Sequence, residues 1–207
     1  MFTLKKKQLW LIRPFPRGMD QMSYFIQHNV IQVGWNEIGD LNKCHTREDI
    51  RAIVEQEGLK AQDANLKIGL LYNIRFQMNI GDYCILPYED FFYLAVVIGE
   101  YNYVDDYMLQ TRSVTFLNQG QPFGKREELP EVLQRSLRSR LALANLTDHI
   151  ELFLSFMREN TSETDPSVKE EFERLLPQSL EIIKNNLDSE EEQLRLLAAL
   201  GVVLYAK

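Results

Sequence analysis

The residue types that most often carry out chemistry are sparse in this sequence. It contains three histidines, His28, His45 and His149, and no two of them have the spacing that places two metal ligands on one face of a helix. Cys44 and His45 are adjacent, but a tetrahedral metal site needs about two further ligands, so a polar loop is the simpler interpretation. The sequence therefore predicts no metal site.

The motifs of several common enzyme classes are also missing. No G-x-G occurs, which excludes the dinucleotide-binding fingerprint, and neither a P-loop nor a G-x-S-x-G nucleophile elbow is found. In many restriction nucleases a metal-binding carboxylate lies two positions before a lysine, and no lysine of this chain has Asp or Glu there. We therefore expect a non-enzymatic protein without a cofactor. A small enzyme acting on nucleic acid is an alternative with no recognisable catalytic group.

Aromatic and basic side chains near predicted strand ends point to binding. Trp35 stands at the end of a predicted strand, where an indole either faces a ligand or plugs the mouth of a barrel. Trp10 lies inside an apolar strand and is expected in the core. Arg135, Arg138 and Arg140 have no acid between them, and they either contact phosphate or form a solvated face.

Composition and charge set limits on the function. The chain has 207 residues and a formal charge of −7, which argues against indiscriminate nucleic-acid binding, although a total can hide a local basic region. Much of the negative charge is C-terminal, since residues 161–207 hold 10 acidic and 5 basic residues. Two cysteines exclude a disulfide framework and favour a reducing cytoplasm. No apolar run approaches the roughly 20 residues that span a membrane.

Hydrophobic patterns predict an α+β fold, a small β-barrel decorated by helices. Thr46 and Asp49 have capping-box spacing, with Asp in place of the usual Glu, and should open a helix. The polar segment 158–167 predicts a linker between a barrel domain, 1–159, and an acidic helical extension, 160–207. Strands are expected at 8–13, 30–35, 83–87, 92–101, 113–117 and 141–146. Helices are expected at 21–28, from Thr46, at 68–76, 130–138 and 147–159, followed by a C-terminal helical hairpin.

Three stretches in order carry a resemblance to a known family. They are LWLIRPFPRGMDQMSYFIQHNVIQVGWNEIGDL at 9–41, MNIGDYCILPYEDFFYLAVVIGEY at 78–101, and LPEVLQRSLRSRLALANL at 129–146. Together they resemble the EVE-like branch of the PUA superfamily, in the version found at the N-terminus of Mrr-like restriction proteins. The likeness covers about residues 8–150, and the family's usual nuclease partner domain is missing.

The resemblance implies a β-barrel that reads a modified base in a restriction or phage-defence setting, with DNA favoured over RNA. In related domains a nucleotide is flipped into an aromatic pocket, where stacking contributes about 1–3 kcal/mol per base. Carried onto this chain, the resemblance implies these nucleic-acid-binding residues: Arg13 at the pocket mouth, Trp35 and Asn36 after the second strand with Trp35 stacking on the base, Asp40 as an acceptor or a turn cap, Tyr88 as a second wall, and Ser136, Arg138 and Arg140 near phosphate.

An alternative function is protein interaction or regulation. The acidic extension has an apolar stripe that a helical hairpin cannot bury alone, so residues 163–207 could recruit an effector protein or a second copy of the chain. Both functions are compatible, with the extension recruiting an effector to a barrel that binds nucleic acid.

Overall fold

The computed structural model of the chain describes residues 6–34, 38–56, 61–104, 109–161 and 184. The contacts divide the chain into two units, Met1–Phe156 and Met157–Lys207. The first unit contains all the strands that the structure describes. The expected C-terminal helical hairpin lies outside the described residues, except for Lys184, and it stays a prediction.

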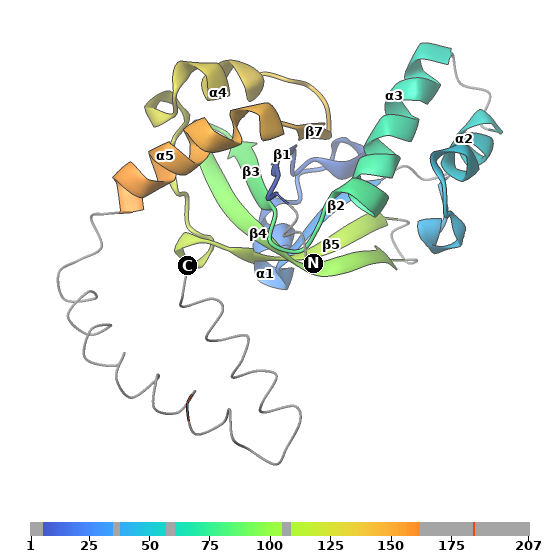
Figure 1. Cartoon of the computed structure of the whole chain (residues 1–207), viewed down its shortest axis with the longest axis horizontal. Coiled ribbons are helices and arrows are strands. Elements are labelled where there is room, and N and C mark those ends of the chain that lie inside the picture. Colours follow the sequence, from blue (N-terminus) through green and yellow to red (C-terminus); the bar gives the residue numbers. More distant parts are fainter. Residues whose placement is uncertain (1–5, 35–37, 57–60, 105–108, 162–183, 185–207) are drawn as a thin grey trace. The chain divides into compact units, whose positions relative to one another are not determined.

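The first unit is an α+β structure around one curled mixed sheet (Figure 1). The strands follow the path β2-β5-β4-β3-β1-β7, and β6 pairs with β4. All pairs are antiparallel except β1 with β3. The strands are β1 Leu9–Ile12, β2 Val30–Gly34, β3 Tyr83–Tyr88, β4 Phe91–Val104, β5 Leu109–Phe116, β6 Gly124–Lys125 and β7 Leu143–Asn145. The α+β class expected from the sequence is therefore confirmed, with the sheet curled as a half-barrel.

Helices lie on both sides of this sheet in Figure 1, with α4 and α5 at the upper left and the packed pair α2 and α3 at the right. The α-helices are α1 Met22–His28, α2 Arg47–Glu55, α3 Ala61–Tyr72, α4 Glu131–Ser136 and α5 Ile150–Thr161. A π-helix, Asn73–Gln77, continues α3, and short 3-10 turns include η1 Pro16–Gly18, η2 Leu41–Lys43, η6 Arg126–Glu128 and η7 Thr147–His149. The predicted capping box is present, since the Thr46 and Asp49 side chains each accept a backbone N–H of the other residue.

Two elements begin earlier than the pattern predicts. The strand expected at 113–117 starts at Leu109, because the polar residues Gln110, Thr111 and Arg112 are all buried and hydrogen-bonded. The helix expected at 68–76 starts at Ala61 and changes to a π-helix after Tyr72. In both cases contacts with residues distant in the sequence stabilise the element. Hydrogen bonds compensate the burial of the polar residues in β5, and α3 packs against α2.

Asp82 joins the turn before β3 to the first strand. Trp10 is fully buried in the core, as expected, and its Nε1 donates to the Asp82 carboxylate at 2.8 Å. The same carboxylate accepts the backbone N–H groups of Gln8 at 3.0 Å and Asn79 at 2.9 Å. Gly81 precedes it with a φ of 91°, a conformation that other residues rarely adopt. The Gly81-Asp82 pair is therefore a structural turn.

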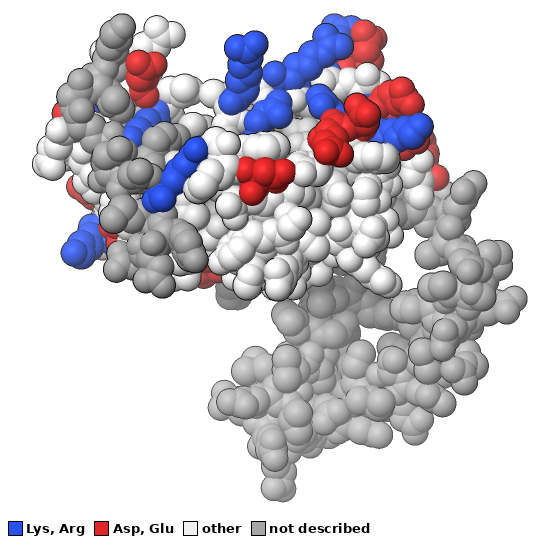
Figure 2. Space-filling model, turned by 180° about the vertical axis from the view of Figure 1, so that it is seen from behind, with Lys and Arg blue, Asp and Glu red and all other residues white. Residues whose placement is uncertain are grey.

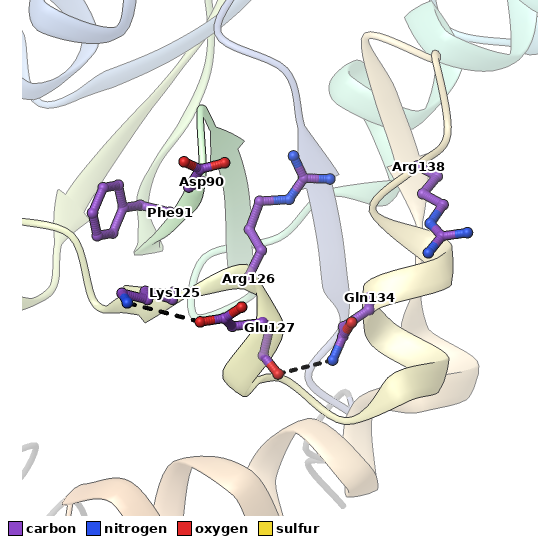
Figure 3. Close-up of a pocket in the computed structure, with 7 residues that line it drawn as sticks. All are labelled: Asp90, Phe91, Lys125, Arg126, Glu127, Gln134 and Arg138. Carbon is purple, nitrogen blue, oxygen red and sulfur yellow. Dashed lines mark hydrogen bonds and ion pairs between the residues drawn. The ribbon is translucent and has the colours of Figure 1, made fainter.

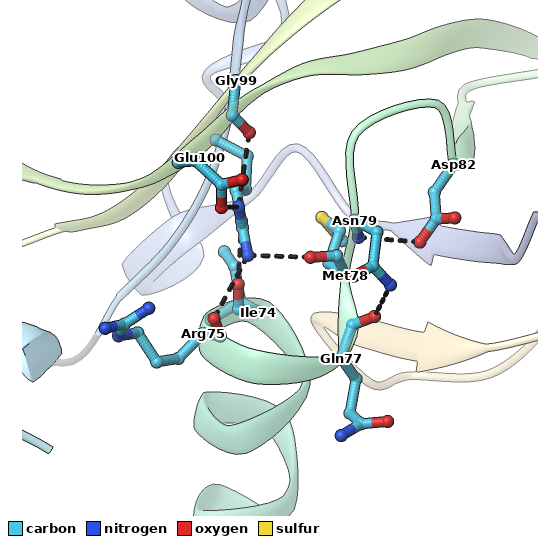
Figure 4. A network of polar contacts seen from close by, with 9 residues as sticks. Ile74, Arg75, Gln77, Met78, Asn79, Asp82, Gly99 and Glu100 are labelled. Carbon is cyan, nitrogen blue, oxygen red and sulfur yellow. Dashed lines mark hydrogen bonds and ion pairs between the residues drawn. The ribbon is translucent and has the colours of Figure 1, made fainter. Parts of the chain in front are cut away.

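The Arg112 side chain of β5 donates five hydrogen bonds and is 1% exposed. Its Nε donates to the Ile74 carbonyl at 2.9 Å. Its Nη2 donates to the Met78 carbonyl at 2.8 Å and to the Arg75 carbonyl at 3.2 Å (Figure 4). These carbonyls belong to the end of the π-helix, where backbone acceptors have no helical partner. Arg112 thus satisfies this helix end while it is held in the sheet.

The other edge of the same guanidinium meets a β-bulge in β4. Nη1 of Arg112 donates to the Gly99 carbonyl at 3.3 Å and to Glu100 Oε2 at 3.2 Å. The register of β4 with β5 shifts between Val97 and Tyr101. A Cβ on Gly99 would lie 2.8 Å from the Ser113 Cβ, so this close approach requires glycine. Burial is the main cause that lowers the pKa of Arg112 from its usual value.

Replacing Arg112 should therefore destabilise the fold strongly. Arg112→Met leaves the carbonyls of the π-helix end buried without a donor, and each buried acceptor left unsatisfied costs about 1–3 kcal/mol. Urea denaturation followed by circular dichroism measures the change. Arg135→Met is the matched control, because Arg135 is exposed and its ion pair among the described residues is with Glu131 one helical turn away, an interaction of about 0.5 kcal/mol. Equal effects of the two changes would contradict this role.

Candidate functional site

A cavity of about 320 Å³ lies where η1 and α1 meet β2 and β5, and we name it the Gln32 cavity. This volume is within the range of small-molecule sites, about 300–1,000 Å³. Gln32 and Leu109 come from the two paired strands, whereas the remaining residues come from the segment between β1 and β2. The lining residues are Pro16, Arg17, Met19, Gln21, Tyr24, Gln32 and Leu109.

Gln32 places a nearly buried amide in this mostly apolar cavity. It is 2% exposed, and its Nε2 donates to the Thr111 hydroxyl of the paired strand at 3.2 Å. Within the described part of the chain, no donor forms a hydrogen bond to the Gln32 Oε1. Buried polar groups in proteins almost always have a partner. A ligand with a hydrogen-bond donor would therefore satisfy this oxygen.

Tyr24 supplies an aromatic side to the same cavity. Its ring stacks at a tilt on His28 one helical turn later, with 4.1 Å between the ring centroids. Residues four apart in a helix lie on one face, so α1 itself fixes the orientation of this ring. The Gln32 cavity thus combines a supported aromatic ring, apolar side chains from Met19 and Leu109, the amides of Gln21 and Gln32, and the Arg17 side chain.

The segment between β1 and α1 is held against the β3–β4 hairpin by Tyr88. The Tyr88 hydroxyl donates to Asp20 Oδ2 at 2.6 Å, and the Phe15 ring stacks on the Tyr88 ring with centroids 6.1 Å apart. This hydrogen bond is the first cause that raises the pKa of Tyr88 to about 12. Tyr88 does not line the Gln32 cavity, so its observed part is to fix the segment that does.

A second cavity, of about 370 Å³, lies beside that hairpin, and we name it the Arg126 cavity. It combines three cations, two carboxylates, an amide and an aromatic ring (Figure 3). Figure 2 shows that basic side chains gather along the upper edge of one face, with acidic side chains among them. The residues that line the cavity are Asp90, Phe91, Lys125, Arg126, Glu127, Gln134 and Arg138.

The described residues among those proposed from the sequence do not line one common cavity. Arg138 lines the Arg126 cavity, whereas the exposed Arg140 lines neither cavity. The Ser136 hydroxyl donates to the Val132 carbonyl of its own helix at 2.9 Å. Asp40 accepts the Asn42 backbone N–H at 2.9 Å, so it caps η2, one of the two roles considered for it.

Arg13 has a structural position at the end of β1. Its Nε donates to the Ser139 carbonyl and its Nη2 to the Leu137 carbonyl, both at 2.7 Å. These bonds fasten the segment after α4 to the first strand. Burial, and then the positive charge of Arg126, lower the pKa of Arg13. Trp35 and Asn36 lie outside the described residues, so their roles stay predictions.

Sequence reasoning missed Gln32, Tyr24 and Arg126. Gln32 had a usable signal, because it is the one polar residue in the apolar strand VIQVG. Tyr24 reads as part of an ordinary amphipathic helix, and Arg126 as part of a charged turn. Only the fold brings them to cavities.

The described residues define an α+β protein with a curled mixed sheet, an amide-containing cavity and a cationic cavity. The chain belongs to the family described as a domain of unknown function (DUF8426), whose model matches residues 12–136. No curated protein matches the chain, and no solved structure matches it. Among the described residues, none of the helices has the length and apolar character to cross a membrane, and no three His, Cys, Asp or Glu side chains are grouped to hold a metal ion.

The contact between Tyr88 and Asp20 predicts an unusual titration. In the folded protein the Tyr88 hydroxyl should titrate near pH 12, against an ordinary pKa of 10.0. The neutral hydroxyl is favoured by the fold, so this contact supports stability below pH 10 and its contribution is lost as the pH rises toward 12. Carbon-13 NMR of labelled tyrosines, with Tyr88→Phe to assign the signal, measures the pKa. Asp20→Ala should return it toward 10, and a parent value near 10 would contradict the contact.

Proposed function

We propose that this protein is a non-catalytic nucleic-acid-binding module that reads a modified base in a restriction or phage-defence setting. The base is flipped out of the stack and enters the Gln32 cavity. DNA is the favoured nucleic acid, and the reducing cytoplasm is the favoured compartment, consistent with two cysteines that are free and buried. The curled sheet is compatible with the PUA-like barrel that the three sequence stretches imply.

The observation that carries the proposal is the buried amide of Gln32 in an apolar cavity beside an aromatic ring. Glutamine amides recognise base edges by hydrogen bonding, and a good pair contributes about 1–3 kcal/mol of discrimination. Stacking on Tyr24 would add about 1–3 kcal/mol. Together these offset the few kcal/mol that eversion of one base costs.

Modification would be read by the apolar side chains of the cavity. Burial of a methyl group on the base contributes about 0.8 kcal/mol when the group fits against side chains such as Met19 and Leu109. Such a small contribution discriminates between bases only in a preformed cavity, which Asp20 and Tyr88 help to hold. A single everted base needs few cations around it, so the acidic total charge of −7 does not oppose this function.

Gln32→Leu is the sharpest test of this function. The change keeps the side-chain size, removes the amide, and should weaken binding of the preferred modified oligonucleotide by about 5- to 150-fold. Fluorescence anisotropy with modified and unmodified oligonucleotides measures it, and thermal melting checks the fold. Gln27→Leu is the matched control, because Gln27 is exposed on α1. Unchanged affinity of a folded Gln32→Leu protein would refute the amide contact.

Trp35 provides a separate test of base stacking. If its indole stacks on the base, Trp35→Ala should weaken binding to the same oligonucleotide by about 5- to 150-fold. The same anisotropy titration measures this change. If the Trp35→Ala protein binds every oligonucleotide as tightly as the parent, Trp35 does not stack on the base. The Gln32→Leu variant then tests the Gln32 cavity independently.

Recruitment of a partner by the acidic extension is a second proposal. It rests on the charge and the apolar stripe of residues 163–207, which lie outside the described residues except for Lys184. Deleting this segment should change the mass measured by size-exclusion chromatography with light scattering if it joins two copies of the chain. A monomer before and after the deletion would exclude self-association.

A further inference from the structure

The Arg126 cavity has positive groups that the fold does not use fully. Among the described residues, the Arg138 guanidinium has no hydrogen bond or ion pair, and the Arg126 side chain donates only to the Glu89 carbonyl, at 3.1 Å. Lys125 lies 3.8 Å from Glu127, and both side chains are more than half exposed, so this pair is weak. Several guanidinium N–H donors are therefore open to an anion.

Two guanidinium groups from different elements line this one cavity. Arg126 belongs to η6 and Arg138 follows α4, as Figure 3 shows. Guanidinium groups bind phosphate through paired N–H donors, which gives geometry as well as charge. Asp90 and Glu127 also line the cavity, so a ligand with several negative charges would be opposed in part, whereas a phosphodiester with one charge would be tolerated.

Phe91 adds an aromatic surface to the same cavity. It is the first residue of β4 and is 37% exposed, so part of its ring is accessible to a ligand. An exposed ring beside guanidinium groups fits a ligand that has both a planar base and a phosphate. Proteins that bind single strands combine these two features.

The two cavities are connected through residues that neighbour their linings in the chain. Asp20, next to Met19 of the Gln32 cavity, accepts the Tyr88 hydroxyl, and Tyr88 begins the turn that leads to Asp90 of the Arg126 cavity. The Arg126 backbone N–H donates to the Asp90 carbonyl at 2.9 Å. The segment that Tyr88 holds also presents the apolar side chains of Met19 and Phe15, which are 52% and 40% exposed and could contact a bound strand.

We propose that the Arg126 cavity binds a second nucleotide of the same strand, with its phosphate on Arg126 and Arg138 and its base against Phe91. This inference rests on the proposed function, since it takes the strand to be the one whose modified base enters the Gln32 cavity. The second site supplies affinity that is independent of the modification, and the Gln32 cavity supplies the discrimination. Phosphate contacts position a nucleic acid and carry no sequence information themselves.

The test is a salt titration of the full chain with single-stranded oligonucleotides that contain or lack the modified base. In Arg126→Gln/Arg138→Gln, affinity should fall for all oligonucleotides alike, and the slope of log K against log salt should become shallower by about 1.4, at about 0.7 per lost phosphate contact. The preference for the modified base should not change. Arg135→Gln is the control, because Arg135 is exposed on α4 and lines neither cavity.

A second probe separates failure of this inference from failure of the proposed function. Adenosine 3′,5′-cyclic monophosphate, a phosphodiester with one negative charge, should shift the amide NMR signals of Lys125, Arg126 and Arg138 in the parent, and adenosine alone should shift them less. Phe91→Ala should weaken the monophosphate shifts. If these shifts are observed but the protein shows no preference for a modified base, the nucleotide site in the Arg126 cavity is supported and the proposed recognition of a modified base is refuted. An unchanged salt slope in the double variant, no shifts with the monophosphate, or an acidic peptide that binds the cavity as well as the monophosphate would overturn the inference.

Discussion

The cost of burying the Arg112 guanidinium constrains the whole sheet. A buried charge is tolerated only when its hydrogen bonds are complete. Arg112 meets this condition by donating to carbonyls at the end of the π-helix and in the bulge of β4. The fold therefore has little freedom in how α3, β4 and β5 meet. Asp82 plays the complementary part at the other end of the same helix–strand connection, where it ties Trp10 of β1 and the preceding residue Gln8 to the turn before β3. Figure 4 shows the Asp82 side chain beside Asn79 of this connection.

This constraint reaches the candidate site through the alternation of side chains in a strand. Residues next to each other in β5 point to opposite faces, so fixing Arg112 on one face also fixes Thr111 on the other. Thr111 holds the amide of Gln32, and Leu109, two residues earlier, lines the same cavity. The opposite wall is set by Tyr88 and Asp20, which hold the segment before α1. The cavity is thus positioned from both sides by polar contacts that belong to the scaffold.

Much of the fold follows from local sequence patterns, because strands, helix caps and turns depend mainly on residues that are close in the sequence. The apolar strands, the burial of Trp10, the Thr46 capping box and the Gly81-Asp82 turn were all accessible from the sequence. The early start of β5 was not, since Gln110, Thr111 and Arg112 become good strand residues only when distant partners satisfy them. Arg13, Asp40 and Ser136 show the converse: each has the chemistry of a binding residue, but nearby backbone groups take up its hydrogen bonds. The cavities are formed by segments far apart in the chain, and among their lining residues the sequence signals were Arg138 and the single glutamine in VIQVG.

The central claim, that one base leaves its stack and enters the Gln32 cavity, is tested most directly by the structure of a complex. The protein would be crystallised with an oligonucleotide duplex that carries a single modified base. The account predicts that this base lies outside the duplex, with its edge about 2.7–3.2 Å from the Gln32 amide and its ring beside Tyr24. A bound duplex in which every base remains stacked, with the Gln32 cavity unoccupied, would contradict it.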